Sequence, residues 1–396
     1  MKRAASLVLA LALCLGLLAG CQSSELRAYS DDLESEASNE VSQKDYTACF
    51  ESYDPEEVMM TINGIDVTWR ELFYWYYYDV SALEQYNGEI SDWDDSSSFN
   101  GEQSYRDYVL NNALEVVKHY CSLETKAEDM GVKLSEEDLA VIKSRWEENV
   151  ASYGSGDEDA FLDYLESIFL SKELYMYINE TSELYNRMKE EVYGINCEKI
   201  SEKEILTRAE EMGYMRAKHI FVSISDAEGN ALSEEDKGAK RAGLQAQIDE
   251  LKAISGIKEL ESRMDELMAE HSEDPGLQYF PDGYTFREGE MDKVFEDAVK
   301  ATAAPGIYHE IVESSTGYHI VMRLPLSASA AVNYLSETES VSLPYLVAED
   351  MFISLADSWA EETEVVYTKA YKKMDIAKVF SKATTVKADE DSSGTD

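Results

Sequence analysis

Cysteine is scarce in this sequence, and the few that are present indicate neither a disulfide framework nor a metal centre. Five cysteines occur in 396 residues. Cys14 and Cys21 lie in and directly after an apolar N-terminal run, which leaves Cys49, Cys121 and Cys197. Three scattered cysteines cannot form a complete set of disulfides, and no Cys-X-X-Cys or mixed His/Cys spacing indicates zinc. The fold must therefore depend on its hydrophobic core, and no metal site is expected.

Positive charge is also scarce. The chain has 35 Lys and Arg residues against 80 Asp and Glu residues, which gives a formal net charge of −45. Nucleic acids and anionic lipids are themselves negatively charged, so this balance argues against either as a partner. The acidic residues lack the ordered spacing of a calcium-binding loop, and we interpret them as a solubilising surface.

Long apolar runs are absent except at the N-terminus. Two basic residues precede the apolar segment 4–18, which is short for a transmembrane helix and typical of a secretory signal. The Leu-Ala-Gly-Cys sequence that ends at Cys21 resembles the bacterial lipobox. This resemblance implies a signal peptide over 1–20, a lipid anchor on Cys21 and a location on the extracytoplasmic face of the cell membrane. The alternative is an ordinary signal peptide with a chance cysteine.

The rest of the chain predicts an α+β fold in which one mixed domain is inserted in a mainly helical body. A polar segment over 21–54 is expected to be a flexible tether. Helical spacing and capping residues dominate 55–212, and helix returns over 327–386, a segment expected to pack with the N-terminal region. Between them, 213–326 changes to strands, helices and turns rich in Pro, Gly and Asp. The polar tail over 387–396 is expected to be disordered.

The start of the helical region is unusually aromatic. An Asn-Gly pair at 63–64 between short apolar runs predicts a two-residue hairpin, and Thr68 with Glu71 predicts a capping box that starts a helix. This helix carries an unbroken aromatic run over 73–78. A helix that is apolar all round is usually buried, but tyrosines can also line a groove that holds other chains. We expect more aromatic surface here than one helix can bury, and hence a binding surface for unfolded chains.

The inserted region predicts the element order β-α-α-β-α-β-β. YMRAKHIFVSI indicates its first strand, helical spacing follows over 234–253, 257–271 and 291–302, and GIYHEIV and GYHIVMRL indicate its last two strands. The first and last strands each carry a histidine, His219 and His319. A lone histidine in a buried strand is usually a core residue satisfied by one hydrogen bond. Two histidines on neighbouring strands could instead meet over one face of the sheet.

The motifs RAKHIFV, HSED, GYTFREGEM, VFEDAV and STGYHIV occur in that order, and together they make 213–326 similar to the parvulin family of peptidyl-prolyl isomerases. In that family the two strand histidines form a hydrogen-bonded pair beneath the substrate prolyl bond. The catalytic residues that the resemblance implies are His219, Asp274, Thr316 and His319. The proline-pocket residues that it implies are Phe286, Met291 and Phe295.

The implied reaction suits these residue types. Resonance holds the peptide bond planar with a barrier of about 18–20 kcal/mol, and rotation about it makes no new covalent bond. No nucleophile, metal or cofactor is therefore expected. An apolar slot can hold the proline ring, while a polar floor fixes the geometry by electrostatic preorganisation. Two departures from the family pattern stand out: the loop over 223–229 is acidic, which disfavours phosphate recognition, and Asp282-Gly283 replaces the usual pair of glycines.

The order of lipobox, helical region, parvulin-like insert and helical C-terminal segment resembles the PrsA-type extracellular foldase lipoproteins, with SurA-like chaperone flanks. The resemblance implies a membrane-anchored isomerase and chaperone that assists the folding of secreted proteins. Its expected partners are unfolded polypeptides with Xaa–Pro bonds, and a homodimer is left open. Two alternatives remain, a holdase chaperone with a degenerate isomerase domain and a surface-anchored binding or scaffold lipoprotein. The absence of repeated α/β lobes argues against the second.

Overall fold

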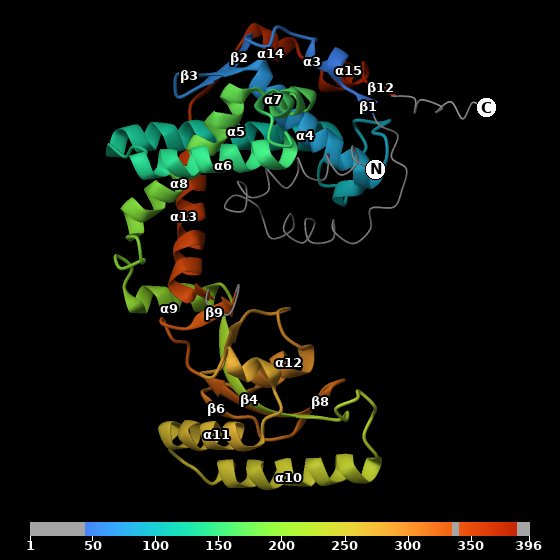
Figure 1. Ribbon diagram of the computed structural model, residues 1–396. Helices are drawn as coiled ribbons and strands as arrows, with labels where there is room; N and C mark the ends of the chain where they lie inside the picture. Colours follow the sequence, from blue (N-terminus) through green and yellow to red (C-terminus); the bar gives the residue numbers. More distant parts are fainter. Residues whose placement is uncertain (1–43, 335–339, 386–396) are drawn as a thin grey trace, which may run out of the picture. The chain divides into compact units, whose positions relative to one another are not determined.

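The computed structural model describes residues 44–334 and 340–385 (Figure 1). The chain divides into two compact units. One, which we call the body, comprises Met1–Val192 and Met351–Asp396, and the other, the insert, comprises Tyr193–Asp350. The insert is wider at both ends than the predicted 213–326. The predicted signal peptide, the anchor Cys21 and the tail lie outside the described residues. Within residues 44–334 and 340–385, no helix is long and apolar enough to cross a bilayer.

The body is mainly helical, as predicted. Its elements are β1 (Lys44–Asp45), α3 (Thr47–Phe50), β2 (Val58–Ile62), β3 (Ile65–Thr68), α4 (Trp69–Asn87), η2 (Ser97–Phe99), α5 (Tyr105–Met130), α6 (Glu136–Tyr153), α7 (Glu158–Ser167), α8 (Lys172–Tyr193), the second half of α13 (Leu343–Glu361), β11 (Val365–Tyr367), α14 (Lys369–Lys373), α15 (Ile376–Phe380) and β12 (Thr384–Thr385). The predicted hairpin joins β2 to β3, where Asn63 and Gly64 have φ angles of 51° and 85°. Both angles lie in the left-handed region, which an Asn-Gly turn adopts readily.

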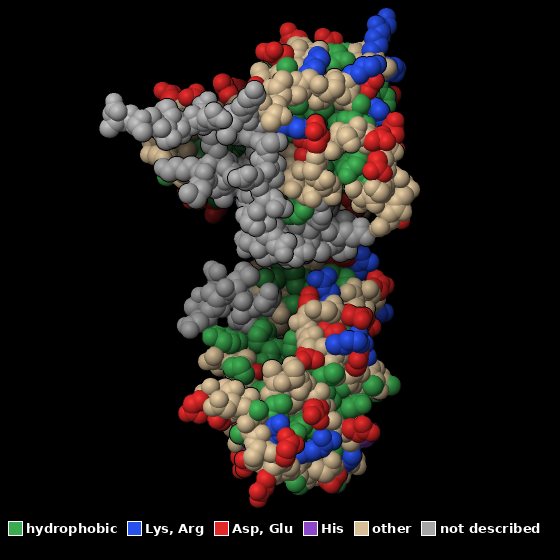
Figure 2. Space-filling model, turned by 90° about the vertical axis from the view of Figure 1, so that its right-hand side faces the viewer, with side chains coloured by type: hydrophobic (Ala, Val, Ile, Leu, Met, Phe, Trp, Pro, Cys, Tyr) green, Lys and Arg blue, Asp and Glu red, His purple; other side chains and the backbone are tan. Residues whose placement is uncertain are grey.

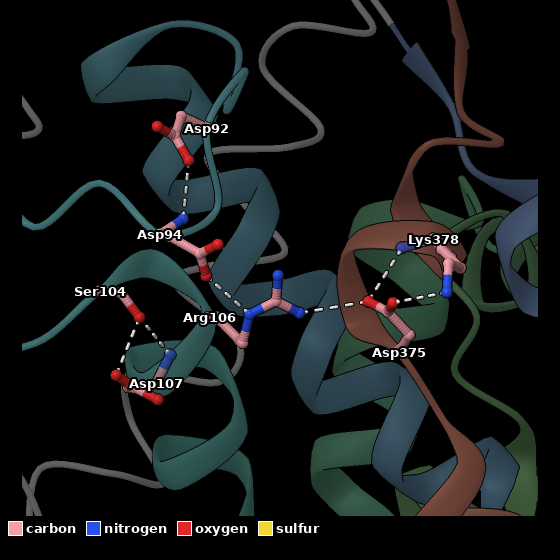
Figure 3. Close-up of polar contacts among 7 residues, drawn as sticks. All are labelled: Asp92, Asp94, Ser104, Arg106, Asp107, Asp375 and Lys378. Atoms are coloured by element: carbon pink, nitrogen blue, oxygen red, sulfur yellow. Dashed lines mark hydrogen bonds and ion pairs between the residues drawn. The ribbon is translucent and has the colours of Figure 1, made fainter.

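The two ends of the body meet. β1 pairs antiparallel with β12, and β11 pairs antiparallel with β2. Arg106 on α5 donates hydrogen bonds to Asp94 (3.0 Å) and to Asp375 (3.2 Å), the residue before α15 (Figure 3). The C-terminal segment from Met351 on thus packs with the N-terminal region, whereas the preceding part of the predicted segment 327–386 belongs to the insert. The predicted tether over 21–54 extends too far, because Cys49 of α3 is fully buried beside α15.

The aromatic run on α4 is core. Phe73 and Tyr76 are fully buried, and Trp75 is 3% exposed. Phe73 stacks on Phe380 of α15, with ring centroids 5.7 Å apart, and Trp75 meets Tyr120 of α5 edge-on at 5.8 Å. The hypothesis that this run forms an exposed binding surface is therefore wrong. Elements from both ends of the body cover most of this run, and only Tyr78 remains partly exposed.

The insert is built on an antiparallel five-stranded sheet. Its elements are α9 (Glu202–Glu211), β4 (Met215–Ser223), α10 (Glu234–Lys252), α11 (Ile257–His271), η3 (Pro275–Gln278), β5 (Tyr284–Phe286), α12 (Lys293–Ala301), β6 (Gly306–Ile307), β7 (Val312–Glu313), β8 (Gly317–Leu324), β9 (Ala331–Tyr334), β10 (Ser340–Ser342) and the first half of α13. The strand order is β5-β4-β8-β6, and β7 also pairs with β8. The predicted order holds, except that GIYHEIV forms two short strands rather than one.

The two faces of this sheet carry different residues, because successive side chains of a strand point to opposite faces. Ile220, Ile320 and Met322 lie in the core with α10 and α11. On that same face, Lys218 is 2% exposed and donates to Glu261 and Asp265 of α11 at 3.0 and 2.7 Å. The other face, with Ala217 and Val321, packs on α12 through Phe295, Ala298 and Val299. His219 and His319 fall on the α12 face.

Candidate active site

The strand register brings the two histidines together. Along the β4–β8 ladder, His219 lies opposite Val321 and His319 lies opposite Phe221, so the histidines are diagonal neighbours on one face. Their Nδ1 atoms are 3.1 Å apart and the rings are nearly parallel, with centroids 5.2 Å apart. The exposed fractions are 7% for His219 and 6% for His319. The pairing that the sequence predicts is therefore present and buried.

Asp274 holds the far side of His219. It is the N-cap of the short helix η3, and its Oδ1 accepts a hydrogen bond from the backbone N–H of Gly276 at 3.0 Å. Its Oδ2 lies 2.9 Å from His219 Nε2 and accepts a hydrogen bond from the hydroxyl of Tyr284 at 2.6 Å. Burial alone would raise the pKa of Asp274, but the hydrogen bonds from His219 and Tyr284 outweigh it and lower the pKa to about 2. Asp274 is thus a carboxylate at neutral pH.

His319 has the opposite character. Burial, with the neighbouring His219, lowers the pKa of His319 to about 4, so this ring is neutral at pH 7. Its Nε2 lies 2.9 Å from the Oγ of Ser314. When both rings are neutral, one direction satisfies the three contacts that join Ser314, His319, His219 and Asp274. Ser314 O–H donates to His319 Nε2, His319 Nδ1–H donates to His219 Nδ1, and His219 Nε2–H donates to Asp274.

Thr316 stands outside this chain of contacts. It is exposed in the turn between β7 and β8, and its Oγ1 lies 3.2 Å from the Oγ of Ser314. Ser314, which is buried, provides the direct contact with His319. A serine hydroxyl on a histidine is also the contact of a nucleophile with its base. Here, however, the Ser314 Oγ also accepts the N–H groups of Thr316 and Gly317 and lies 3.2 Å from the carbonyl oxygen of Gly317, so the hydroxyl is held within a buried turn.

The three predicted pocket residues lie on the same side of the sheet. The Phe295 ring meets His219 edge-on, with centroids 5.2 Å apart, and the Phe286 ring lies 5.6 Å from that of Phe295. Phe286 and Phe295 are 2% and 1% exposed, whereas Met291 is only partly buried against them. The two phenylalanines therefore form the floor beside the histidine pair, and Met291 lies at its accessible edge.

Two residues of this site, Tyr284 and Ser314, were not predicted. Tyr284 precedes Phe286 by two positions, so strand alternation places both on one face, and this spacing was a usable signal. Ser314 is one of several adjacent hydroxyl residues in a turn, and no pattern singles it out. Among the residues that the structure describes, no group of three or more His, Cys, Asp or Glu side chains is arranged to hold a metal ion.

The comparison with known families decides what this domain is. Residues 219–324 match the family model described as rotamase, PPIC-type PPIase domain. The insert therefore contains a parvulin-type peptidyl-prolyl cis–trans isomerase domain. The match runs from the first histidine of the pair to the end of β8. It covers Asp274, Ser314 and all three apolar residues of the site.

Solved structures with partial similarity include peptidyl-prolyl isomerase PrsA from Bacillus anthracis, with 18% identity, covering 67% of this chain and 94% of its own, at a TM-score of 0.21. PrsA from Bacillus subtilis has 17% identity, covers 83% and 93%, and has a TM-score of 0.22. A SurA-like chaperone structure from Campylobacter jejuni, reported for PEB4 and Cj1289, has 16% identity, covers 67% and 87%, and has a TM-score of 0.22. No curated protein matches this chain.

Proposed function

We propose that this protein is a membrane-anchored, extracytoplasmic peptidyl-prolyl isomerase and chaperone that assists the folding of secreted proteins. The observation that carries the catalytic part is the buried chain from Asp274 through His219 and His319 to Ser314, beside Phe295. The anchor and the location are supported by the lipobox-like sequence at Cys21, and the chaperone role by the resemblance of the chain's organisation to PrsA-type lipoproteins.

The site is suited to rotating a prolyl bond rather than cleaving it. The planar amide is the more charge-separated state, so a surrounding less polar than water favours the twisted form. Met291 and the phenylalanine floor supply that surrounding. The histidine chain beneath keeps its donors and acceptors fixed while the bond turns, which avoids reorganisation during the reaction. No proton needs to leave the substrate.

The loop after β4 indicates which substrates are not preferred. It contains the carboxylates of Asp226 and Glu228. The loop lies next to the turn before β8, because the N–H of Ile224 donates a hydrogen bond to the carbonyl oxygen of Thr316 at 3.1 Å. The nearby cation of Lys240 is already bound by Glu273 at 2.8 Å and by the carbonyl of Ser223 at 3.0 Å. A phosphate or carboxylate next to the proline would find Lys240 already paired and would face the like charge of this loop. We therefore infer that neutral or basic neighbours of proline are favoured.

Isomerisation is tested on the whole protein with a short peptide that contains one Xaa–Pro bond, observed by NMR exchange between its cis and trans signals. The exchange should accelerate with catalytic amounts of protein, and Asp274→Ala should lower the acceleration. The same two proteins are then compared for suppressing aggregation of a reduced, unfolded client. Suppression by both, with no acceleration by either, would support the non-catalytic holdase instead.

The anchor has its own test. Cys21→Ser should abolish labelling by a fatty acid and move the protein from the membrane fraction to the soluble one. A variant with a conservative change at Cys49, which is buried in α3, serves as the matched cysteine control. Unchanged membrane association of Cys21→Ser would contradict the anchor. Figure 2 shows acidic and basic side chains interspersed on the face that it draws, and the net charge of −45 opposes electrostatic attachment to anionic lipid.

A further inference from the structure

Tyr284 links the strand at the edge of the sheet to the catalytic carboxylate. It lies on β5, on the same face as Phe286, and its ring meets His219 edge-on with centroids 5.6 Å apart. Its hydroxyl donates to Oδ2 of Asp274 at 2.6 Å. Unlike the two phenylalanines, this side chain is only partly buried. Tyr284 is thus an aromatic residue that reaches both the histidine pair and the accessible side of the site.

The hydroxyl of Tyr284 decides how Asp274 is oriented. Oδ1 is held by the backbone N–H of Gly276, and Oδ2 receives both the His219 Nε2 contact and the tyrosine hydroxyl. A carboxylate with both oxygens bound this way cannot rotate without breaking a charge-assisted hydrogen bond. The same donors favour its ionised form. If the hydroxyl were absent, Oδ1 would keep Gly276 and Oδ2 would keep only His219, so the carboxylate plane would be held by one hydrogen bond fewer.

The fold leaves room for this contact at one position. A methyl group at Gly276 would overlap the hydroxyl of Tyr284. Glycine there has no positive φ, so its backbone would also accept alanine. Glycine is therefore required at position 276 by the close contact between η3 and β5, and not by the backbone conformation of the turn. Gly276 thus helps Asp274 twice, through its N–H group and through the space that it leaves.

We propose that Tyr284 is a positioning residue of the isomerase, which acts on His219 by fixing Asp274. This inference rests on the proposed catalytic role of the histidine chain. A positioning residue should affect the rate of bond rotation more than substrate binding, and it should act only through the residue that it positions. Gly276 contributes to the same positioning, because a side chain at that position would displace the hydroxyl of Tyr284.

The first test measures kcat and KM of the whole protein by NMR exchange with a peptide containing one Xaa–Pro bond. Tyr284→Phe should lower kcat about tenfold, the loss expected from one charge-assisted hydrogen bond, and leave KM within about twofold. The matched control is Tyr308→Phe, since Tyr308 packs against the same core but is not among the hydrogen-bond partners of the Asp274 carboxylate. A loss confined to KM, or an equal loss in the control, would overturn the proposal.

The second test asks whether the effect passes through Asp274. In an Asp274→Ala background, Tyr284→Phe should have no further effect on kcat, whereas a merely structural change would add its loss independently. Gly276→Ala keeps the tyrosine but displaces its hydroxyl, so it should reproduce the loss seen with Tyr284→Phe. Additive losses in the Asp274→Ala background would overturn the proposal.

The third test does not depend on activity, so it separates this proposal from the proposed function. The proton on His219 Nε2 is observed by NMR in the whole protein. Its resonance should move in Tyr284→Phe, because Asp274 Oδ2 then has one donor fewer, and it should stay in place in Tyr308→Phe. If the wild-type protein does not accelerate peptide isomerisation, the catalytic function fails, but a shift of this resonance still supports the contact. An unmoved resonance in Tyr284→Phe overturns it.

Discussion

Acid should weaken the insert through His319. Burial and the neighbouring His219 lower the pKa of His319 from 6.5 in its unperturbed state to about 4. As the pH falls below 6.5, the unfolded chain binds a proton at this residue and the folded chain does not. The contribution of His319 to stability is therefore complete above pH 6.5 and is lost progressively as the pH falls toward 4.

The size of the effect follows from the two pKa values. At pH 5 His319 is almost fully protonated in the unfolded chain and mostly neutral in the folded one. Proton binding then stabilises the unfolded chain relative to the folded chain by about 2 kcal/mol. The side chain is 6% exposed, so solvent screens it little. Such a loss is a large share of the stability of a domain, which is commonly about 5–15 kcal/mol. The comparison stays at pH 5 and above, because the chain's pI of about 4.3 would promote precipitation below it.

The assay must see the insert separately from the body. All five tryptophans lie outside Tyr193–Asp350, so tryptophan fluorescence reports on the body alone. Hydrogen exchange of peptides from β8, corrected for the intrinsic dependence on pH, gives the free energy of opening for the insert. Between pH 7 and pH 5 this free energy should fall by about 2 kcal/mol more in the wild type than in His319→Gln.

Two results would refute this reasoning. The first is an equal fall in His319→Gln, which would mean that other groups cause the acid sensitivity. The second is no fall in the wild type, which would mean that His319 is not held neutral. His271→Gln is the matched control, since His271 is exposed at the end of α11, and it should keep the wild-type dependence on pH.

Three further predictions concern other parts of the molecule. Burial and nearby Glu124 raise the pKa of Glu71 to about 7, so the body should lose stability as the pH rises from 4.5 through 7. Glu71→Gln should lessen the loss of stability between pH 6 and 8, as measured by urea titrations followed by tryptophan fluorescence. Met291→Ala should raise KM severalfold at little cost in stability, whereas Phe295→Ala, in the core, should cost about 3–5 kcal/mol by hydrogen exchange. Lys218→Met should change the stability of the insert by less than about 1 kcal/mol, but replacing both carboxylate partners by alanine should cost about 3 kcal/mol, because the buried charge is then unpaired.

The sequence predicted most of the site because the ordered motifs of the insert resemble the parvulin family, which implies these residues, and because most of them lie on regular elements. His219 and His319 could be placed on neighbouring strands, and the alternation of each strand then determined which face they share. Asp274 was assigned through the resemblance to the parvulin family, and it lies just after the end of α11, as N-cap of η3. The element order followed from the periodicities along the chain, whereas the pairing of β4 with β8 was a hypothesis that the structure confirms.

The contacts that the sequence did not predict depend on turns. Ser314 takes its place beside His319 because the turn between β7 and β8 folds its hydroxyl inward and leaves Thr316 exposed. Two hydroxyl residues at nearby positions look alike in sequence, and only the turn geometry distinguishes them. To predict the contact of Tyr284 with Asp274, one must know how close β5 lies to η3, and the small size of Gly276 contributes to that closeness. A side chain can be placed on a face from sequence, but its partner across a loop cannot.

The aromatic run of α4 shows why burial is harder to predict than periodicity. A helix that is apolar on every face is buried if enough other elements surround it and forms a binding surface if they do not. Here the covering residues come from distant parts of the chain, among them Phe169 after α7 and Phe380 on α15, whose rings lie 5.0 and 5.7 Å from that of Phe73. Nothing in the local sequence of α4 specifies them. A client-binding surface on the body must therefore lie away from Phe73, and a loss of chaperone activity on changing Phe73 would reflect a damaged core rather than lost contact with a client.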